Sequence, residues 1–143
     1  MKPDSQENSD YEETISHNGH RLTPQRREVY DVLLSKRDHP TATEVFLRAK
    51  ARMPSISLAT VYNCLETLVD CGLAQQVNVE REATRYCPNL SLHAHFFCER
   101  CGQVFDVPLA VGKRLERAWE LPEGFTVNQS EINLRGVCSA CDT

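Results

Sequence analysis

Two Cys-x-x-Cys pairs are the part of this sequence whose spacing predicts chemistry most directly. They are Cys98–Cys101 and Cys138–Cys141, and residues 102–137 lie between them. Each pair turns two thiolates toward one small ion, and two pairs complete the tetrahedral shell of four sulfurs used by structural zinc sites. A redox pair would not explain a second, matching pair, and an iron–sulfur cluster would have no other electron-transfer feature beside it. The sequence therefore predicts a structural Zn(II) that ties the end of the chain to its middle.

A second group of potential ligands mixes imidazole, thiolate and carboxylate. Two of its histidines stand two residues apart in a strand-like run, so both side chains project to one face. Each member alone has a plain structural explanation, as a loop, core or strand-end residue. Together they offer N, S and O donors from both halves of the chain, and an ion bound by them would fix the angle between the halves. The group consists of His39, Cys87, His93, His95 and Asp106.

Length and composition limit the class of protein. The 143 residues allow one ordinary domain or two small ones, and a hydrophobic content of 41% is enough for a core. No apolar run approaches the roughly 20 residues of a membrane span, and the N-terminus lacks the apolar stretch of a signal peptide. We expect no membrane association and a cytoplasmic location. The cysteine count of seven is odd, which favours metal binding over a disulfide scaffold; Cys64 and Cys71 are interpreted as core residues rather than redox thiols.

Three short helices with clear start signals are expected in the first half. Thr23 caps the first, Thr41 and Glu44 form a capping box for the second, and Ser57 caps the third, which ends near Gly72. Two strand-like runs follow, at 73–79 and 84–87. This order is that of a winged helix-turn-helix.

The net charge is −4 for residues 1–19, +2 for 20–75 and −2 for 76–143, so the helical segment is the positive one.

The second half alternates between strand and helix patterns. Strands are expected at 93–98, 103–107, 125–127 and 131–134, with a helix from Pro108 to Trp119. The predicted fold class is α+β: a winged-helix domain followed by a small α/β domain that carries the Cys₄ zinc. The edge of the second sheet could pair with a second copy, and a winged helix commonly binds DNA. The predicted boundaries are therefore a flexible acidic tail at 1–17, with some helix near Tyr11–Ile15, a DNA-binding domain at 18–88, and a dimerisation and metal-binding domain at 89–143.

Several motifs in the same order resemble those of the ferric uptake regulator family of metal-dependent bacterial repressors. They are Leu22-Thr23-Pro24-Gln25-Arg26, His39-Pro40-Thr41-Ala42, Ile56 to Tyr62, Gly72-Leu73, the run from His93 to Gly102, and Gly136 to Cys141. The resemblance implies a homodimer with a winged-helix domain, a Cys₄ zinc and a regulatory metal at the hinge. The residue after Tyr62 is Asn63, and an Asn at this position is similar to the sequences of the peroxide-responsive branch. The peroxide-responsive branch has an Asp at the position of Cys87, whereas the zinc-uptake branch has a Cys near this point. A thiolate ligand favours a softer metal ion.

The resulting hypothesis is a metal-dependent, sequence-specific transcriptional repressor, and not an enzyme. The regulatory ion would be Zn(II), Fe(II) or Mn(II), and the partner a palindromic double-stranded DNA operator. The third helix would present Ser57, Ala59, Thr60, Tyr62 and Asn63 to the bases, although the same face would also suit plain solvation. Arg21, Arg26, Arg27 and Arg52 are expected at phosphates. Two alternatives stay open: a thiol-based redox protein or chaperone with a structural zinc, and a metal-independent DNA-binding protein.

Overall fold

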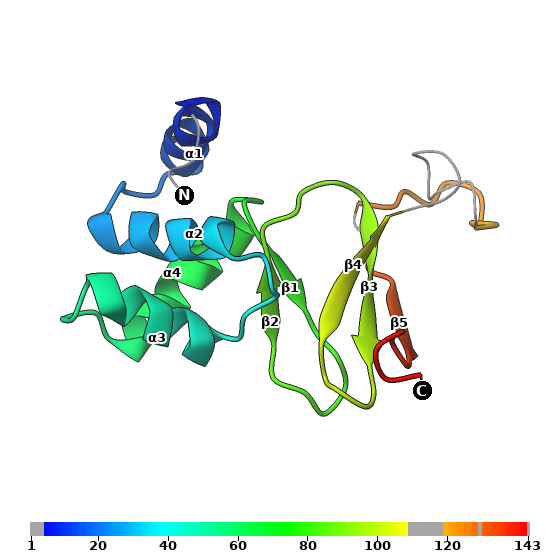
Figure 1. Cartoon of the computed structure of the whole chain (residues 1–143). Helices are drawn as coiled ribbons and strands as arrows, with labels where there is room; N and C mark the ends of the chain where they lie inside the picture. The colour runs from blue at the N-terminus through cyan, green and yellow to red at the C-terminus, as the bar shows by residue number, and fades with distance from the viewer. Residues whose placement is uncertain (1–4, 109–118, 129, 143) are drawn as a thin grey trace. The chain divides into compact units, whose positions relative to one another are not determined.

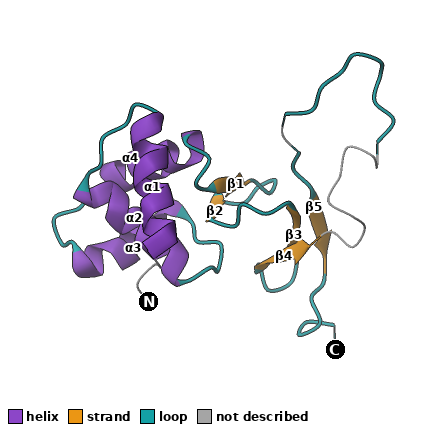
Figure 2. Ribbon diagram, turned by 90° about the horizontal axis from the view of Figure 1, so that it is seen from above, coloured by secondary structure: helices purple, strands orange, loops and turns teal. Residues whose placement is uncertain are grey.

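The computed structural model describes residues 5–108, 119–128 and 130–142. The chain divides into two compact units, residues 1–90 and 91–143, and each is described by itself (Figure 1). Helices dominate the first unit, and a three-stranded sheet forms the second (Figure 2). The mixed α+β class predicted from the sequence is confirmed. Among the described residues, no helix has both the length and the apolar character needed to cross a membrane.

Three helices build the centre of the first unit, and each begins at a hydroxyl cap. They are α2 (Pro24–Ser35), α3 (Ala42–Arg52) and α4 (Leu58–Asp70). The hydroxyls of Thr23, Thr41 and Ser57 accept hydrogen bonds from the amide three residues further on, at 3.2, 3.2 and 3.1 Å respectively. These bonds satisfy N–H groups that have no partner within the helix. All three predicted starts are therefore confirmed.

Apolar side chains at helical spacing turn inward and form one core. Its most deeply buried members come from all three helices: Val29, Leu33, Val45, Ala49, Val61, Leu65 and Leu68. Helix α4 ends where Gly72 takes a φ of 75°, a left-handed backbone that glycine adopts without a steric penalty. The core thereby fixes which face of α4 is buried and which is exposed.

The N-terminal segment differs from the predicted flexible tail. Residues Ser5–His17 form helix α1, which is seen beside the other helices in Figures 1 and 2. Tyr11 and Ile15, one helical turn apart, are buried in the core of the first unit. The Tyr11 ring stacks on that of Tyr30 with centroids 4.8 Å apart. The helix expected near Tyr11–Ile15 is confirmed, but the flexible tail is wrong for residues 5–17, because two apolar side chains dock this otherwise polar helix on the core.

A short antiparallel hairpin completes the first unit. Strands β1 (Gln75–Val77) and β2 (Arg85–Cys87) pair with Gln75 opposite Cys87. Both strands fall inside the runs predicted from the sequence. The hairpin also contacts the segment before α3, through a bridge between Thr41 and Arg85.

The sheet of the second unit has the order β4-β3-β5. Its strands are β3 (His93–Cys98), β4 (Val104–Pro108) and β5 (Asn133–Gly136). Strand β3 pairs antiparallel with β4 and parallel with β5. Residues 125–127 are not a strand, contrary to the prediction, and the predicted strand at 131–134 begins and ends two residues later. Of the helix predicted from Pro108 to Trp119, Pro108 instead ends β4, and residues 109–118 lie outside the described residues.

Candidate metal centres and DNA-binding surface

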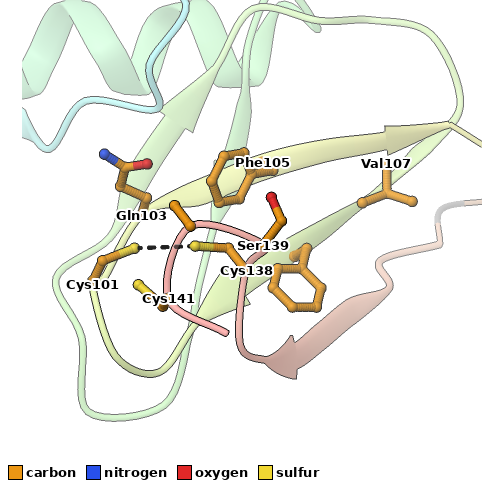
Figure 3. A pocket seen from close by; sticks show the side chains of 9 residues that line it. Cys101, Gln103, Phe105, Val107, Cys138, Ser139 and Cys141 are labelled. Carbon is orange, nitrogen blue, oxygen red and sulfur yellow. Dashed lines mark hydrogen bonds between the residues drawn. The ribbon is translucent and has the colours of Figure 1, made fainter. Parts of the chain in front are cut away.

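The four sulfurs of the Cys-x-x-Cys pairs lie together in the second unit. Strand β3 ends at Cys98, and its parallel pairing with β5 places Cys98 opposite Gly136, two residues before Cys138. All four Sγ atoms lie within 4.8 Å of one another, and those of Cys101 and Cys138 are 3.8 Å apart (Figure 3). A tetrahedral zinc with Zn–S bonds of about 2.3 Å needs sulfurs roughly 3.8 Å apart. The sheet register therefore brings these sulfurs to a separation that fits zinc.

Backbone amides point at the most deeply buried of these sulfurs. The N–H groups of Cys101 and Cys138 donate to Cys98 Sγ at 3.5 and 3.4 Å, and they lower the pKa of the Cys98 thiol to about 6. Hydrogen bonding with Cys138, together with burial and the other sulfurs, raises the pKa of the Cys141 thiol to about 12. Thiolates this close repel one another, so four ionised sulfurs require a cation among them. A Zn(II) ion would supply that charge and would leave no open coordination position.

An open pocket of about 470 Å³ borders the cysteine cluster. Cys101, Cys138 and Cys141 line part of it, together with Phe105 (Figure 3). Phe96 also lines the pocket. Cys101 is exposed, whereas Cys98 is fully buried. A chelator would therefore reach the cluster from the pocket side.

Two imidazoles and a carboxylate converge elsewhere in the same unit. The register of β3 and β4 sets His95 opposite Asp106. Asp106 Oδ1 lies 3.2 Å from His93 Nε2 and 3.3 Å from His95 Nε2, and the two Nε2 atoms are 3.0 Å apart. Because His93 Nδ1 lies 2.6 Å from the Ser91 carbonyl, which only accepts, the neutral His93 ring carries its proton on Nδ1 and its lone pair on Nε2. The lone pair on His93 Nε2 thus faces His95 Nε2 and Asp106 Oδ1, as the ligand atoms of a metal site do.

Two further predicted ligands belong to the first unit. His39 stands just before Pro40 and α3, and Cys87 ends β2. Their ligand atoms lie within 4.8 Å of each other. The five residues predicted as one regulatory site are thus found as a pair in the first unit and as a group of three in the second.

The outer face of α4 carries the predicted base-reading residues. Ser57, Ala59, Tyr62 and Asn63 are exposed, with Tyr62 at 51%. Thr60 is half-buried, and its hydroxyl lies 2.9 Å from that of Ser57. This face is polar and accessible, as a helix that enters the major groove requires.

The arginines predicted at phosphates differ in how firmly they are held. Arg26 Nη1 donates to the Arg21 carbonyl at 2.7 Å. Arg27 pairs with Asp31 at 3.1 Å, and its guanidinium lies 4.9 Å from the Tyr11 ring centroid. Arg21 and Arg52 are exposed. Arg27 therefore helps to dock α1 and is the least suited of the four to reach a phosphate.

Arg85 was not among the residues predicted from the sequence. This residue donates from Nη1 to the His39 carbonyl at 3.0 Å. The only sequence feature that points to it is its position on β2 two residues before Cys87, since side chains at that spacing share a face.

Known proteins match nearly the whole chain. The sequence profile of the ferric uptake regulator family matches residues 17–135. The chain belongs to the ferric uptake regulator family. It is 32% identical over 123 residues to the peroxide-responsive repressor PerR of Staphylococcus aureus, which covers 86% of this chain and 83% of that protein.

Solved structures of this family share the fold. The peroxide stress regulator of Campylobacter jejuni superposes with a TM-score of 0.68 at 29% identity, covering 97% of this chain and 100% of that one. A zinc uptake regulator complexed with zinc and DNA also gives a TM-score of 0.68, at 25% identity and with 98% and 96% of the two chains covered. Family members are transcription regulators and not enzymes. The family, the absence of enzymatic activity and the class of metal-responsive regulator were all predicted from the sequence and are confirmed.

Proposed function

We propose that this protein is a metal-dependent, sequence-specific repressor that binds a palindromic DNA operator as a homodimer in the cytoplasm. The regulatory metal would be held by His39 and Cys87 of the first unit and by His93, His95 and Asp106 of the second. The four cysteines of the second unit would hold a separate Zn(II) that supports the fold.

The convergence of His93, His95 and Asp106 carries this proposal. Three ligand atoms lie within 3.3 Å of one another, and the His93 lone pair is directed at the other two, which is the arrangement that a bound cation needs. A divalent cation would supply the positive charge that brings such donors together. With two nitrogens and one carboxylate, the group lacks ligands for a full coordination shell, and His39 and Cys87 are the donors that would complete it.

The sharing of ligands between units gives the proposed switch its physical basis. An ion that needs donors from both units restricts how far one unit turns against the other. In a homodimer, that restriction sets the separation of the two α4 helices, which must match successive major grooves of a palindrome. Removal of the regulatory metal would free the units and lower operator affinity, while the Cys₄ zinc would stay in place.

The exposed face of α4 supports the DNA-binding part of the proposal. Tyr62 and Asn63 offer a thymine-methyl contact and an amide for adenine, and the hydroxyls of Ser57 and Thr60 suit phosphates or base edges. Arg21, Arg26 and Arg52 would contact phosphates, which fix position without reading sequence.

The identity of the regulatory ion is tested by comparing metals on one operator. The starting protein keeps its Cys₄ zinc, and its regulatory site is emptied. It is then titrated with Zn(II), Fe(II) or Mn(II), and operator affinity is measured for the wild type and for Cys87→Asp. The Cys87 thiolate is a soft ligand, so the wild type is expected to respond at the lowest concentration to Zn(II), and Cys87→Asp to shift the preference toward Fe(II) or Mn(II). An identical metal preference in both proteins would remove Cys87 from the site.

A second candidate function is the sensing of peroxide, which the 32% identity to PerR favours. In this version the ion is Fe(II), and peroxide oxidises His39 or His93. The expected result is loss of operator binding together with a mass gain of one oxygen on a peptide that contains one of these histidines. Full operator binding by the Fe(II) protein after peroxide treatment would exclude this version and leave metal sensing intact.

Two alternative functions are distinguished from the proposed repressor by two measurements. Thiol titration tests for a redox protein or chaperone, and operator affinity tests for a metal-independent DNA-binding protein. A thiol-based redox protein or chaperone would show rapid reaction of most of its seven thiols in the native, zinc-loaded state. A metal-independent DNA-binding protein would bind the operator equally with the regulatory site empty or full. The proposed repressor predicts slow thiol reaction and unequal binding.

A further inference from the structure

The backbone of His39 lies in the left-handed region. Its φ is 56°, a conformation that residues other than glycine adopt in only a few per cent of cases, although histidine tolerates it better than most. A backbone in this region persists only where neighbouring groups hold it. The direction of the His39 imidazole follows from this backbone, so the groups that hold it also aim the ring.

Strand β2 supplies the groups that hold this segment. Arg85 Nη1 donates to the His39 carbonyl at 3.0 Å, and the Tyr86 amide donates to the Pro40 carbonyl at 3.0 Å. A bridge between Thr41 and Arg85 continues the contact by one residue. Three successive residues from His39 to Thr41 are thus tied to two successive residues of one strand.

The Arg85 side chain also reaches the first turn of α3. Its Nη1 lies 3.9 Å from Glu44 Oε1, and Glu44 is held by its capping contacts with Thr41 at 3.2 Å. With 22% of its side chain exposed, Arg85 is more enclosed than Glu44 at 41%. One guanidinium therefore joins the His39 carbonyl to the start of α3, and Cys87 follows two residues later on the same face of β2.

We propose that Arg85 is a positioning residue for the regulatory metal: it holds the strained His39 backbone so that the imidazole faces Cys87. The inference rests on the proposed function, because it assumes that His39 and Cys87 bind metal. Arg85 itself touches no metal in this account. Its guanidinium acts through the carbonyl of one ligand and through the strand that carries the other.

The test measures Co(II) binding by spectroscopy to protein that keeps its Cys₄ zinc. Absorption from Co(II) in a site with nitrogen and sulfur ligands reports occupancy directly, without DNA. Arg85→Leu keeps apolar bulk but removes every donor, and we expect its Co(II) affinity to fall about 10- to 100-fold, the usual cost of losing an outer partner of a metal ligand. Arg85→Lys restores a positively charged donor group and should recover part of the loss with the spectrum of the wild type.

Arg81→Ala is the matched control, because it removes an exposed guanidinium from the turn of the same hairpin. It should bind Co(II) as the wild type does. Wild-type affinity in Arg85→Leu, or equal losses in the leucine and lysine variants, would overturn the positioning role. If Arg85→Leu does not fold, Arg85→Lys is still expected to lose at least about threefold, since a flexible ammonium cannot reproduce the fixed geometry with which the guanidinium meets the His39 carbonyl; an unchanged lysine variant would then overturn the inference.

His39→Ala distinguishes this failure from failure of the proposed function. If wild-type protein takes up no Co(II) beyond the Cys₄ site, or if His39→Ala binds as tightly as the wild type, the regulatory site itself is wrong and Arg85 has nothing to position. If His39→Ala loses binding and Arg85→Leu does not, the regulatory site stands and only the role of Arg85 falls.

Discussion

Single cysteines of this chain differ in chemistry because their neighbours differ. Two backbone amides lower the pKa of the Cys98 thiol to about 6, which favours the thiolate that a metal needs. Burial among apolar side chains raises the pKa of the Cys64 thiol instead, and burial also raises that of Cys71. The structure therefore places four cysteines at separations that suit a metal, and it packs Cys64 and Cys71 against the core of the first unit.

Replacement of one zinc ligand tests this separation. Cys101→Ser should lose the Cys₄ zinc and destabilise the second unit by several kcal/mol, on the order of what loss of a structural metal costs. The matched variant Cys71→Ser should keep one zinc per chain and change the free energy of unfolding by about 1 kcal/mol or less. Metal analysis and thermal unfolding give both results; equal zinc content in the two variants would contradict the assignment.

The lowered pKa of Cys98 also predicts how zinc retention depends on pH. The folded pKa of about 6 lies below the ordinary value of 9.0, so the thiolate favours the folded state fully above pH 9. This contribution declines as the pH falls and is lost below about pH 6. Zinc transfer to a chelator should therefore become markedly easier between pH 8 and pH 5. A transfer rate that does not change over this range would contradict the prediction.

Local sequence signals predicted the starts of the helices of the first unit. The bounds of the strands were predicted less accurately, because they depend on pairing with distant residues. A helix cap needs only a hydroxyl and the next three residues, so Thr23, Thr41 and Ser57 were readable from sequence. The bounds of β5 depend on its register with β3, in which Cys98 lies opposite Gly136. No local pattern carries that register, so the strand was predicted two residues early.

Helix α1 was predicted only near Tyr11–Ile15, and its full extent and its docking were not predicted. Its sequence is polar except for Tyr11 and Ile15, and its stability comes from docking these two side chains rather than from its own pattern. Within the candidate site, ligand types were readable from residue identity. The role of Arg85 was not, because its acceptor lies 46 residues away on another segment.

Docking of α1 through Tyr11 yields a prediction for this element. Tyr11→Ala removes a ring that is 2% exposed and stacked on Tyr30, so the first unit should lose about 3 kcal/mol of unfolding free energy. Amide hydrogen exchange in α1 should also be faster in Tyr11→Ala than in the wild type. Glu12→Ala, on the exposed side of the same helix, should change neither. Slow exchange in α1 of the Tyr11 variant would show that other contacts hold the helix.

At the scale of the whole molecule, we propose different roles for the two metal centres. Four sulfurs would complete the shell of a structural Zn(II) next to the C-terminal ends of β3 and β5. Strands β3 and β4 carry His93, His95 and Asp106, and the first unit carries His39 and Cys87. A regulatory metal that requires both sets would convert ion concentration into the geometry of DNA binding by α4, and the proposed regulation depends on this step.

The most direct test of that step is operator affinity at one fixed Cys₄ zinc content. Fluorescence anisotropy of a labelled operator is measured for the dimer with the regulatory site empty and then filled by one metal equivalent per subunit. Wild-type affinity should rise at least about tenfold on filling, which corresponds to about 1.4 kcal/mol. His93→Ala should keep its Cys₄ zinc and its oligomeric state but show no rise. Equal wild-type affinity in the two metal states would contradict the account.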